Sequence, residues 1–268
     1  MTEVSLINLV SIAASTRCRI LDTAFRAGKG HIGSALSICE IMCAVAHTAK
    51  GFGTDDPRRD RVILSKGHAS MALYCTLVEF GKLSPSALDT FCRNGSLLQT
   101  HPDQELVGVD FSTGSLGQGV GFGVGTSLAA KLQHLKYRTF TVLSDSELNE
   151  GSTWEAAAIA GTQELSSLTV ILDLNGQQAL GRTNEVLQMG DARTVWTNLG
   201  WEVTEVDGHD TQSIAEILNK TPTSNKPNLV VAHTTSGKGV SYMEHKVEWH
   251  YLPMSPSQYE QALREQQS

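Results

Sequence analysis

Polar side chains that could bind a metal ion follow two apolar segments of the chain, at the points where those segments end. Asp145 follows the apolar run 140–143, and Asn175, thirty positions later, follows the run 168–172. A carboxylate oxygen, an amide oxygen and a backbone carbonyl, completed by water and phosphate oxygens, form the kind of octahedral shell that Mg²⁺ requires. Free N–H groups at the start of a helix near Glu147 would attract the phosphate. The pattern therefore predicts a diphosphate bridged by magnesium.

The same two residues also have a simpler interpretation. Asp145 is a typical cap at the start of a helix, and Asn175 is a typical turn residue. Caps and turn residues of these types are common in α/β proteins, so the pair leaves both interpretations open. The choice between them depends on the longer stretch in which the two residues lie.

Histidines in loops are the other candidates for chemistry. Those that follow predicted strands or lie beside glycine are His31, His68, His101, His209 and His250. An imidazole titrates near neutral pH, so histidines gathered at one edge of a sheet could bind phosphate or sugar hydroxyls and move protons. A single loop histidine is more commonly a solvated side chain. No zinc-ligand spacing, nucleophile elbow or P-loop is present in the sequence.

The segments that carry these residues alternate between predicted strands and predicted helices. Short apolar runs predict strands at 61–64, 140–143 and 168–172, and further strands are expected at 201–206 and 228–234. Amphipathic or alanine-rich runs predict helices at 4–27, 36–48, 69–80, from Ser84-Pro85, 119–134, 147–160, 192–199, 211–220 and 256–266, with a turn at 30–34 and a loop at 236–255. This alternation predicts an α/β fold with a mainly parallel sheet flanked by helices, in a single domain over 1–268.

Composition limits the partners that the protein could have. The chain has 268 residues, a formal net charge of −7 and only 18% charged residues, so no global basic surface for nucleic acid is expected. No apolar run reaches membrane-spanning length, so no membrane partner is expected either. The five cysteines show no CxxC spacing, which is typical of a protein in a reducing compartment. We therefore expect a cytoplasmic protein.

One long stretch and several shorter motifs resemble the transketolase family. The stretch 144–181 is similar to the family's thiamine diphosphate motif, which opens Gly-Asp-Gly and closes near an asparagine about thirty residues on. Further similar motifs occur, in the family's order, at 30–33, 63–70, 112–119, 206–210 and 237–241. The resemblance extends from about residue 15 to residue 253 and implies the family's thiamine diphosphate-binding fold.

Three residues depart from the family's pattern. Ser144 and Ser146 stand where the family has glycines, and a Cβ there would be unfavourable if either residue needed a positive φ. Tyr251 follows Trp249-His250 at a position where the family usually has glycine. These positions decide how closely the chain can reproduce the family's cofactor site.

The resemblance implies a role for each matching residue. It implies that thiamine diphosphate is contacted by His68, Gly114, Leu116, Asp145, Ser146, Glu147, Asn175 and His250. It implies that Mg²⁺, or Ca²⁺ or Mn²⁺ in its place, is bound by Asp145, Asn175 and the carbonyl of Gln177. It implies catalytic roles for His31, His101 and His250, which would face the substrate, and for Glu150 and Glu155, in a carboxylate network across a subunit interface. The alternative for the two glutamates is a solvated helix face.

The resemblance covers only the amino-terminal part of a transketolase, since a complete one is more than twice this length. It therefore implies the amino-terminal subunit of a split enzyme that is active only with a separate carboxyl-terminal chain, in a heterotetramer. The implied reaction is transfer of a two-carbon ketol unit from a ketose, such as a sugar phosphate, to an aldose acceptor. Two alternatives remain open: a two-component thiamine diphosphate enzyme with a 2-oxo acid donor or a non-sugar acceptor, and a non-catalytic scaffold subunit.

Overall fold

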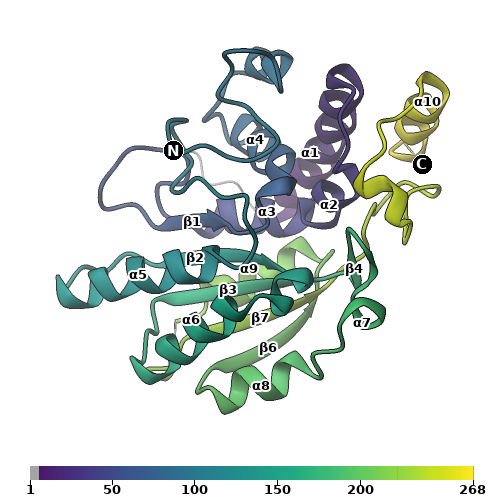
Figure 1. Cartoon of the computed structure of the whole chain (residues 1–268). Coiled ribbons are helices and arrows are strands. Elements are labelled where there is room, and N and C mark those ends of the chain that lie inside the picture. The colour runs from purple at the N-terminus through teal and green to yellow at the C-terminus, as the bar shows by residue number, and fades with distance from the viewer. Residues whose placement is uncertain (1–5, 222, 268) are drawn as a thin grey trace.

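A parallel sheet forms the centre of the protein, whose computed structural model describes residues 6–221 and 223–267 (Figure 1). Its strands are β1 (Arg61–Leu64), β2 (Thr139–Ser144), β3 (Leu168–Leu174), β6 (Glu202–Asp207) and β7 (Asn228–His233), in the order β1-β2-β3-β7-β6. All neighbouring strands in this sheet are parallel. The predicted α/β fold with a mainly parallel sheet is confirmed.

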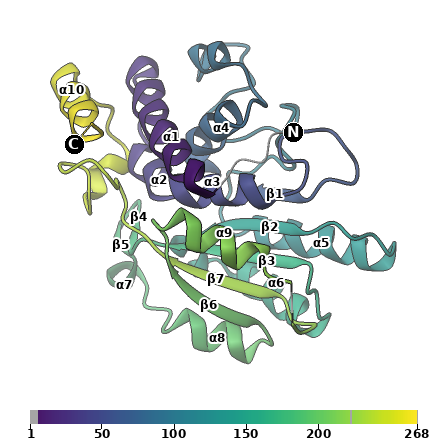
Figure 2. The same ribbon diagram turned by 180° about the vertical axis from the view of Figure 1, so that it is seen from behind.

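Helices cover both faces of the sheet, as the two opposite views show (Figures 1 and 2). One face carries α1 (Leu6–Ala27), α3 (Cys39–Thr48), α4 (Ser70–Glu79) and α9 (Thr211–Asn219), which pack on one another. The other face carries α5 (Gly119–Leu132), α6 (Gly151–Thr162) and α8 (Ala192–Asn198). None of the helices in the described residues is long and apolar enough to cross a membrane.

Successive strand residues supply the two opposite cores. In β2, Val142 packs into the core beneath α1 and α3, whereas its neighbour Leu143 packs into the core beneath α5 and α6. In β3, Ile171 and Leu172 divide in the same way. Side chains alternate between the faces of a strand, so a strand covered on both faces must be apolar at nearly every position. This explains why β2 and β3 stand out in the sequence as short continuous apolar runs, whereas the edge strand β6 (EVTEVD) is largely exposed.

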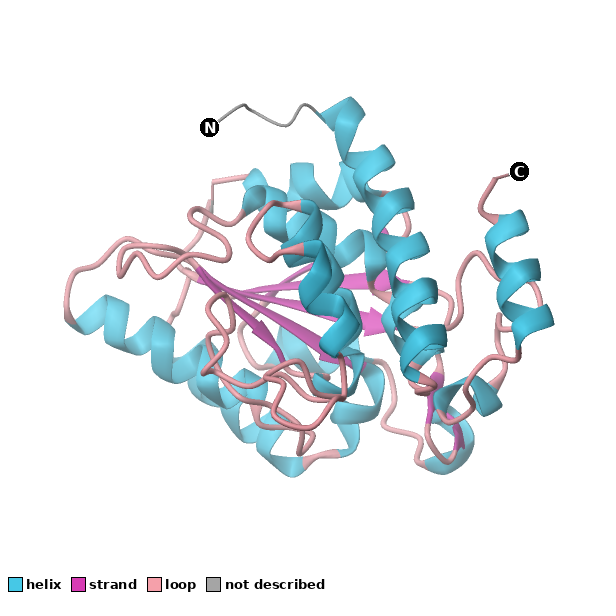
Figure 3. Cartoon of the chain, turned by 90° about the horizontal axis from the view of Figure 1, so that it is seen from above, coloured by secondary structure: helices cyan, strands magenta, loops and turns pink. Residues whose placement is uncertain are grey.

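Smaller elements complete the chain. These are α2 (Ile32–Ser37), α7 (Thr183–Val186), α10 (Pro256–Glu265), the antiparallel hairpin of β4 (Gln177–Gln178) and β5 (Gly181–Arg182), and 3₁₀ turns at Gly67–Ala69, Pro85–Thr90, Asp145–Asn149 and Val247–His250. The last helix, α10, lies beside α1 near the carboxyl end of the chain (Figure 3). Phe25 and Tyr259 stack there, with ring centroids 4.2 Å apart.

Several predicted boundaries were wrong. The helix expected at 147–160 begins only at Gly151, because Glu150 has an extended backbone (φ −95°, ψ 125°) that separates α6 from the 3₁₀ turn after β2. The turn expected at 30–34 already contains the start of α2. The helix expected at 36–48 is interrupted at Ile38, where one helix ends and the next begins.

Other corrections concern short elements. The helix expected after Ser84-Pro85 is a 3₁₀ turn, and the loop expected at 236–255 contains another at Val247–His250. The hairpin of β4 and β5 was not predicted, because strands of two residues carry no periodic pattern. Residues 4 and 5 of the first predicted helix lie outside the described residues.

Candidate active site

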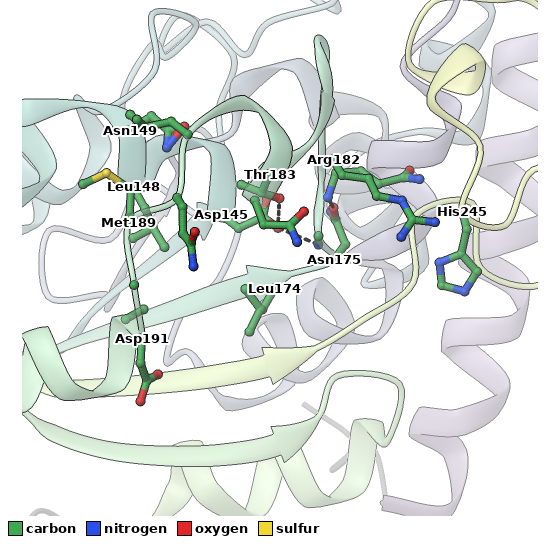
Figure 4. A pocket seen from close by; sticks show the side chains of 17 residues that line it. Asp145, Leu148, Asn149, Leu174, Asn175, Arg182, Thr183, Met189, Asp191 and His245 are labelled. Carbon is green, nitrogen blue, oxygen red and sulfur yellow. Dashed lines mark hydrogen bonds between the residues drawn. The ribbon is translucent and has the colours of Figure 1, made fainter.

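The predicted metal ligands meet where β2 and β3 end (Figure 4). Asp145 is only 1% exposed, and its Oδ2 accepts hydrogen bonds from the Gly176 amide (2.6 Å) and the Thr183 hydroxyl (3.2 Å). Its Oδ1 is buried and has no hydrogen-bond partner among the described residues. Asn175 Oδ1 accepts from the Gln177 amide at 2.9 Å. The structure thus places Asp145, Asn175 and Gln177 together; their role in binding a metal stays a prediction.

The electrostatics of Asp145 fit a cation. Burial raises the pKa of Asp145 to about 7, and the neighbouring Asp173 carboxylate adds to this rise. The buried, unpartnered Oδ1 is therefore an oxygen that an adjacent positive charge would stabilise in its ionised form. No group of three or more His, Cys, Asp or Glu side chains in the described part of the chain could hold a metal by itself. Few protein ligands, supplemented by phosphate and water, are typical of Mg²⁺.

A pocket of about 840 Å³ opens beside Asp145 (Figure 4). Its walls come from the ends of β2 and β3, the β4–β5 hairpin, α7, the segment that leads into α8, and His245. This volume is within the range of pockets that bind cofactors. Leu187 and Met189 belong to the lining and are 50% and 37% exposed, so part of the pocket wall is apolar and open to solvent.

Three of the predicted histidines form a cluster. The ring centroids of His31 and His68 are 5.5 Å apart, those of His31 and His250 are 5.1 Å apart, and those of His68 and His250 are 5.2 Å apart. The His31 amide donates to the His250 carbonyl at 3.2 Å, which joins the start of α2 to the 3₁₀ turn at Val247–His250. His31 has a left-handed backbone (φ 60°), and its Nδ1 is buried without a partner among the described residues.

Burial makes these histidines weak bases. It lowers the pKa of His250 to about 4, and it also lowers the pKa of His31 and, more strongly, that of His68. Positive charge nearby acts in the same direction: Lys66 on His68 and His250, and His101 on His31. The three imidazoles are therefore neutral at pH 7, and an incoming anion would favour their protonation.

The remaining predicted contacts surround this cluster or lie apart from it. His101 packs against Gly114, where an added Cβ would be 3.3 Å from His101 Cδ2, so the position favours a residue without a side chain. Leu116, two residues on, is half-buried in the same loop. His209 is separate from the cluster, because its Nδ1 lies 3.0 Å from Glu40 and its Nε2 accepts from the Thr235 amide. Both ring nitrogens of His209 are therefore occupied by contacts within the protein, which indicates a structural role.

The residues after β2 are engaged inside the protein. Both Glu147 carboxylate oxygens accept hydrogen bonds: one from the Ser65 hydroxyl (2.5 Å) and the Gly117 amide (2.9 Å), the other from the Ser144 amide (2.9 Å). A cofactor contact from Glu147 must therefore use its backbone. Ser144 has φ −92°, and Ser146 is not among the residues with positive φ, so neither serine strains the turn.

Glu150 and Glu155 are not part of the pocket or of the histidine cluster. Both are exposed, Glu150 immediately before α6 and Glu155 within it. Glu150 lies close to Gly117, whose positive φ of 82° turns the loop that follows Leu116. The structure therefore leaves the two carboxylates free to meet another chain, and their catalytic role stays a prediction.

A buried ion pair that sequence reasoning missed joins the two ends of the site. Lys66 and Asp173 are 1% and 0% exposed at their side chains, and the lysine Nζ contacts the Asp173 carboxylate. Asp173 also accepts from the Asn175 amide group at 2.8 Å and from the Ser37 hydroxyl at 2.7 and 2.6 Å. It therefore orients Asn175 so that Oδ1 faces away from Asp173. The available signal was that each charged residue lies at a strand end, Lys66 after β1 and Asp173 within the end of β3.

Comparison with known proteins identifies one family along nearly the whole chain. Residues 10–266 match the family described as transketolase, thiamine diphosphate binding domain. An apulose-4-phosphate transketolase subunit of Phocaeicola vulgatus is 39% identical over 253 residues, which cover 93% of this chain and 90% of that protein. The 6-deoxy-6-sulfo-D-fructose transketolase subunit SqwG of a Clostridium species is 36% identical over 243 residues, covering 89% of this chain and 88% of that protein.

Longer transketolases match over a part of their length. Human transketolase is 34% identical over 246 residues, which cover 89% of this chain and 39% of the human protein. Among solved structures, the transketolase of Campylobacter jejuni is similar with a TM-score of 0.87 and 26% identity, over 98% of this chain and 42% of that chain. A variant of the Pichia stipitis enzyme is similar with a TM-score of 0.88 and 30% identity, over 98% and 41%. The chain thus spans about two fifths of these solved proteins.

Proposed function

This chain belongs to the transketolase family through its thiamine diphosphate-binding domain, and we propose that it is the amino-terminal subunit of a two-chain transketolase. The observation that supports this most directly is that one site contains both a buried carboxylate with an unpartnered oxygen and a cluster of neutral histidines. Asp145, with its unpartnered oxygen, lies at one end, and His31, His68 and His250 lie at the other. We propose that residues 1–268 act as one domain.

The residues at the metal end fit a divalent cation and a diphosphate. Asp145, Asn175 and the carbonyl of Gln177 would hold Mg²⁺, or Ca²⁺ or Mn²⁺ in its place. The backbone of Ser146 and Glu147 would face the diphosphate, and His68 and His250 would contact it from the other side. In this arrangement the cation would contact the unpartnered Oδ1 of Asp145, and the negatively charged diphosphate would lie next to the imidazoles.

The loop beside His101 would hold the organic part of the cofactor. Gly114 and Leu116 would contact its aminopyrimidine through backbone groups, and Gly114 lies directly beside His101. Thiamine diphosphate, when bound, supplies the carbon nucleophile that breaks and forms the carbon–carbon bond. His31, His101 and His250 would bind the sugar and exchange protons with its hydroxyl and carbonyl oxygens. Neutral imidazoles can accept such protons.

Exposed apolar side chains around the site support a separate partner chain. Leu180 on the hairpin is 80% exposed, Leu187 at the pocket is 50% exposed, and Leu252 after the histidine cluster is 49% exposed. Such residues commonly mark a protein interface when they gather at one site. We propose that a carboxyl-terminal transketolase chain covers them in a heterotetramer, with Glu150 and Glu155 at a contact between chains. The cytoplasmic location expected from the sequence stays a prediction.

The substrates proposed are ketoses and aldoses, including sugar phosphates. Relatives of similar length are named for apulose 4-phosphate and for 6-deoxy-6-sulfo-D-fructose, both of which are anionic sugars. We propose the same class here: transfer of a two-carbon ketol unit from an anionic ketose to an aldose. The identity of the donor and the acceptor is set by contacts that a partner chain would complete.

The test is the native mass of the complex purified gently from its natural source. We expect a second chain, together with the mass of thiamine diphosphate and a divalent cation, and ketol transfer from a ketose phosphate to an aldose. A complex with a second chain but no cofactor would instead indicate a scaffold. A cofactor-loaded complex that accepts only 2-oxo acid donors would indicate the alternative two-component enzyme.

A further inference from the structure

Tyr251 connects the two ends of the candidate site. Its ring lies edge-on against His250, with centroids 5.4 Å apart, and its hydroxyl donates a hydrogen bond to the carbonyl of Ala179. Ala179 lies in the turn between β4 and β5, 72 residues earlier in the chain. One side chain therefore reaches from the histidine cluster to the hairpin of the metal end.

The backbone of Tyr251 is anchored on the histidine side. Its amide donates to the Glu248 carbonyl at 3.0 Å, within the 3₁₀ turn that carries His250. Its carbonyl packs so closely on Gly30 that a Cβ at Gly30 would be 2.3 Å from the oxygen. The neighbouring His250 carbonyl accepts from the His31 amide. The main chain of Tyr251 is thus held firmly, while its side chain is 54% exposed.

The hairpin at the other end has little support of its own. Its two strands have two residues each, and they pair only as Gln177 with Arg182 and Gln178 with Gly181. An isolated two-stranded hairpin is at best marginally stable, so the position of this one depends on contacts with the rest of the protein. It begins at Gln177, a predicted metal ligand, and leads into Thr183, whose hydroxyl donates to Asp145.

We propose that Tyr251 is a positioning residue that fixes the hairpin relative to the histidine cluster. Its hydroxyl holds the Ala179 turn, and the hairpin in turn holds Gln177 and Thr183 beside Asp145. Tyr251 is not among the residues that line the pocket. The expected effect of Tyr251 on cofactor binding rests on the proposed function. Its effect on the position of the hairpin does not.

The test compares Tyr251→Phe with a matched control, Tyr242→Phe. The Tyr242 hydroxyl also donates to a backbone carbonyl, that of Gln258 at 2.7 Å, but this contact lies away from the hairpin. Amide hydrogen exchange of residues 176–183 is measured in the full chain by mass spectrometry. Loss of one hydrogen bond should speed exchange there about fivefold in Tyr251→Phe and leave it unchanged in Tyr242→Phe. Equal exchange in both variants and the wild type would overturn the proposal.

A second measurement separates positioning from a merely structural role. Urea unfolding should give both variants nearly the same stability, whereas the Kd for thiamine diphosphate with Mg²⁺, measured on the complex with its partner chain, should rise about fivefold only in Tyr251→Phe. Faster exchange with an unchanged Kd would overturn the positioning role. If the wild-type complex binds no cofactor while exchange responds as expected, the proposed function fails and the hold on the hairpin stands.

Discussion

Asp145 at the metal end is buried and the histidines at the other end are partly buried, and burial moves the pKa values of the two ends in opposite directions. It raises the pKa of Asp145 to about 7 and lowers that of His250 to about 4. Burial disfavours whichever form of a group is charged, so the acid becomes weaker and the base becomes weaker. Neither end has its full charge at neutral pH. The site is thus complementary to a ligand that brings both charges, a cation for one end and an anion for the other.

The two ends also differ in how they are held. The histidine end is tied together by backbone contacts, such as the His31 amide on the His250 carbonyl. The metal end depends on side chains, chiefly on Asp173, which is paired with Lys66 and orients Asn175. The Lys66–Asp173 pair is near both ends, because Lys66 also lowers the pKa of His68 and His250. Substitutions at each end test this division.

Removing one member of the buried ion pair should have the largest effect. Lys66→Met leaves Asp173 as a buried, uncompensated carboxylate, which should lower the free energy of unfolding by about 3–5 kcal/mol. Urea denaturation at pH 7 measures this change. The double variant Lys66→Met/Asp173→Leu removes both charges and should be more stable than the single variant. A double variant as unstable as Lys66→Met would show that the lost stability is not due to the unpaired charge.

Removing the carboxylate at the metal end should abolish most cofactor binding without unfolding the protein. Asp145→Ala deletes the only carboxylate among the predicted ligands, so the affinity for thiamine diphosphate with Mg²⁺ should fall by about a hundredfold or more. Calorimetric titration of the complex with its partner chain measures the affinity. Asp55→Ala, which changes an exposed aspartate in a loop, is the control and should bind normally. Unchanged affinity in Asp145→Ala would contradict the metal assignment.

The opposite pKa shifts should produce opposite pH dependences of stability in the cofactor-free chain. Asp145 has a raised pKa. Its contribution to the free energy of unfolding is therefore fully present below its unfolded-state pKa near 4 and is lost as the pH rises toward about 7. His250 has a lowered pKa, so its contribution increases as the pH rises from about 4 toward 6.5. Since a pKa difference of one unit corresponds to about 1.4 kcal/mol, each group should change the free energy of unfolding by about 3–4 kcal/mol across its pH range.

Two variants separate these contributions. Relative to the wild type, Asp145→Asn should gain stability as the pH rises from 4 to 7, because the wild type alone meets the cost of ionising a buried carboxyl. For His250→Gln the change with pH should have the opposite sign: its free energy of unfolding relative to the wild type should fall as the pH rises from 4 to 6.5. At low pH the wild-type imidazole is protonated more readily in the unfolded chain than in the folded one, and this penalty, which the variant lacks, disappears as the pH rises. Urea unfolding at several pH values measures both. Parallel pH profiles for all three proteins would contradict the opposite shifts.

The serines that replace glycine should have the smallest effect. Ser146→Gly removes a hydroxyl that lies 2.9 Å from the Ser144 hydroxyl, and should cost about 1 kcal/mol of stability or less. Because Ser146 has no positive φ, the glycine relieves no strain and the affinity for thiamine diphosphate should change less than about threefold. The same titration tests this. A gain of about tenfold or more would show that the serine obstructs the cofactor.

Much of the fold was predictable because the central strands of its sheet are buried on both faces. The apolar runs that ended before Asp145 and near Asn175 marked β2 and β3, and the parallel arrangement brought both residues to one edge. The family resemblance supplied the residue types of the site, and the match over residues 10–266 confirms the family. Short elements were not predictable, since α2 and the hairpin are too short to show a period.

The alternation of strands and helices, the family, and the residue types at the strand ends can all be read from the amino-acid sequence. These follow from local patterns of apolar and polar residues. Contacts between residues far apart in the sequence become visible in the tertiary structure: Lys66 pairs with Asp173, His31 lies against His250, and the Tyr251 hydroxyl donates to the Ala179 carbonyl. The tertiary structure alone decided the pKa shifts as well, because burial and neighbouring charge depend on which distant segments pack around a group.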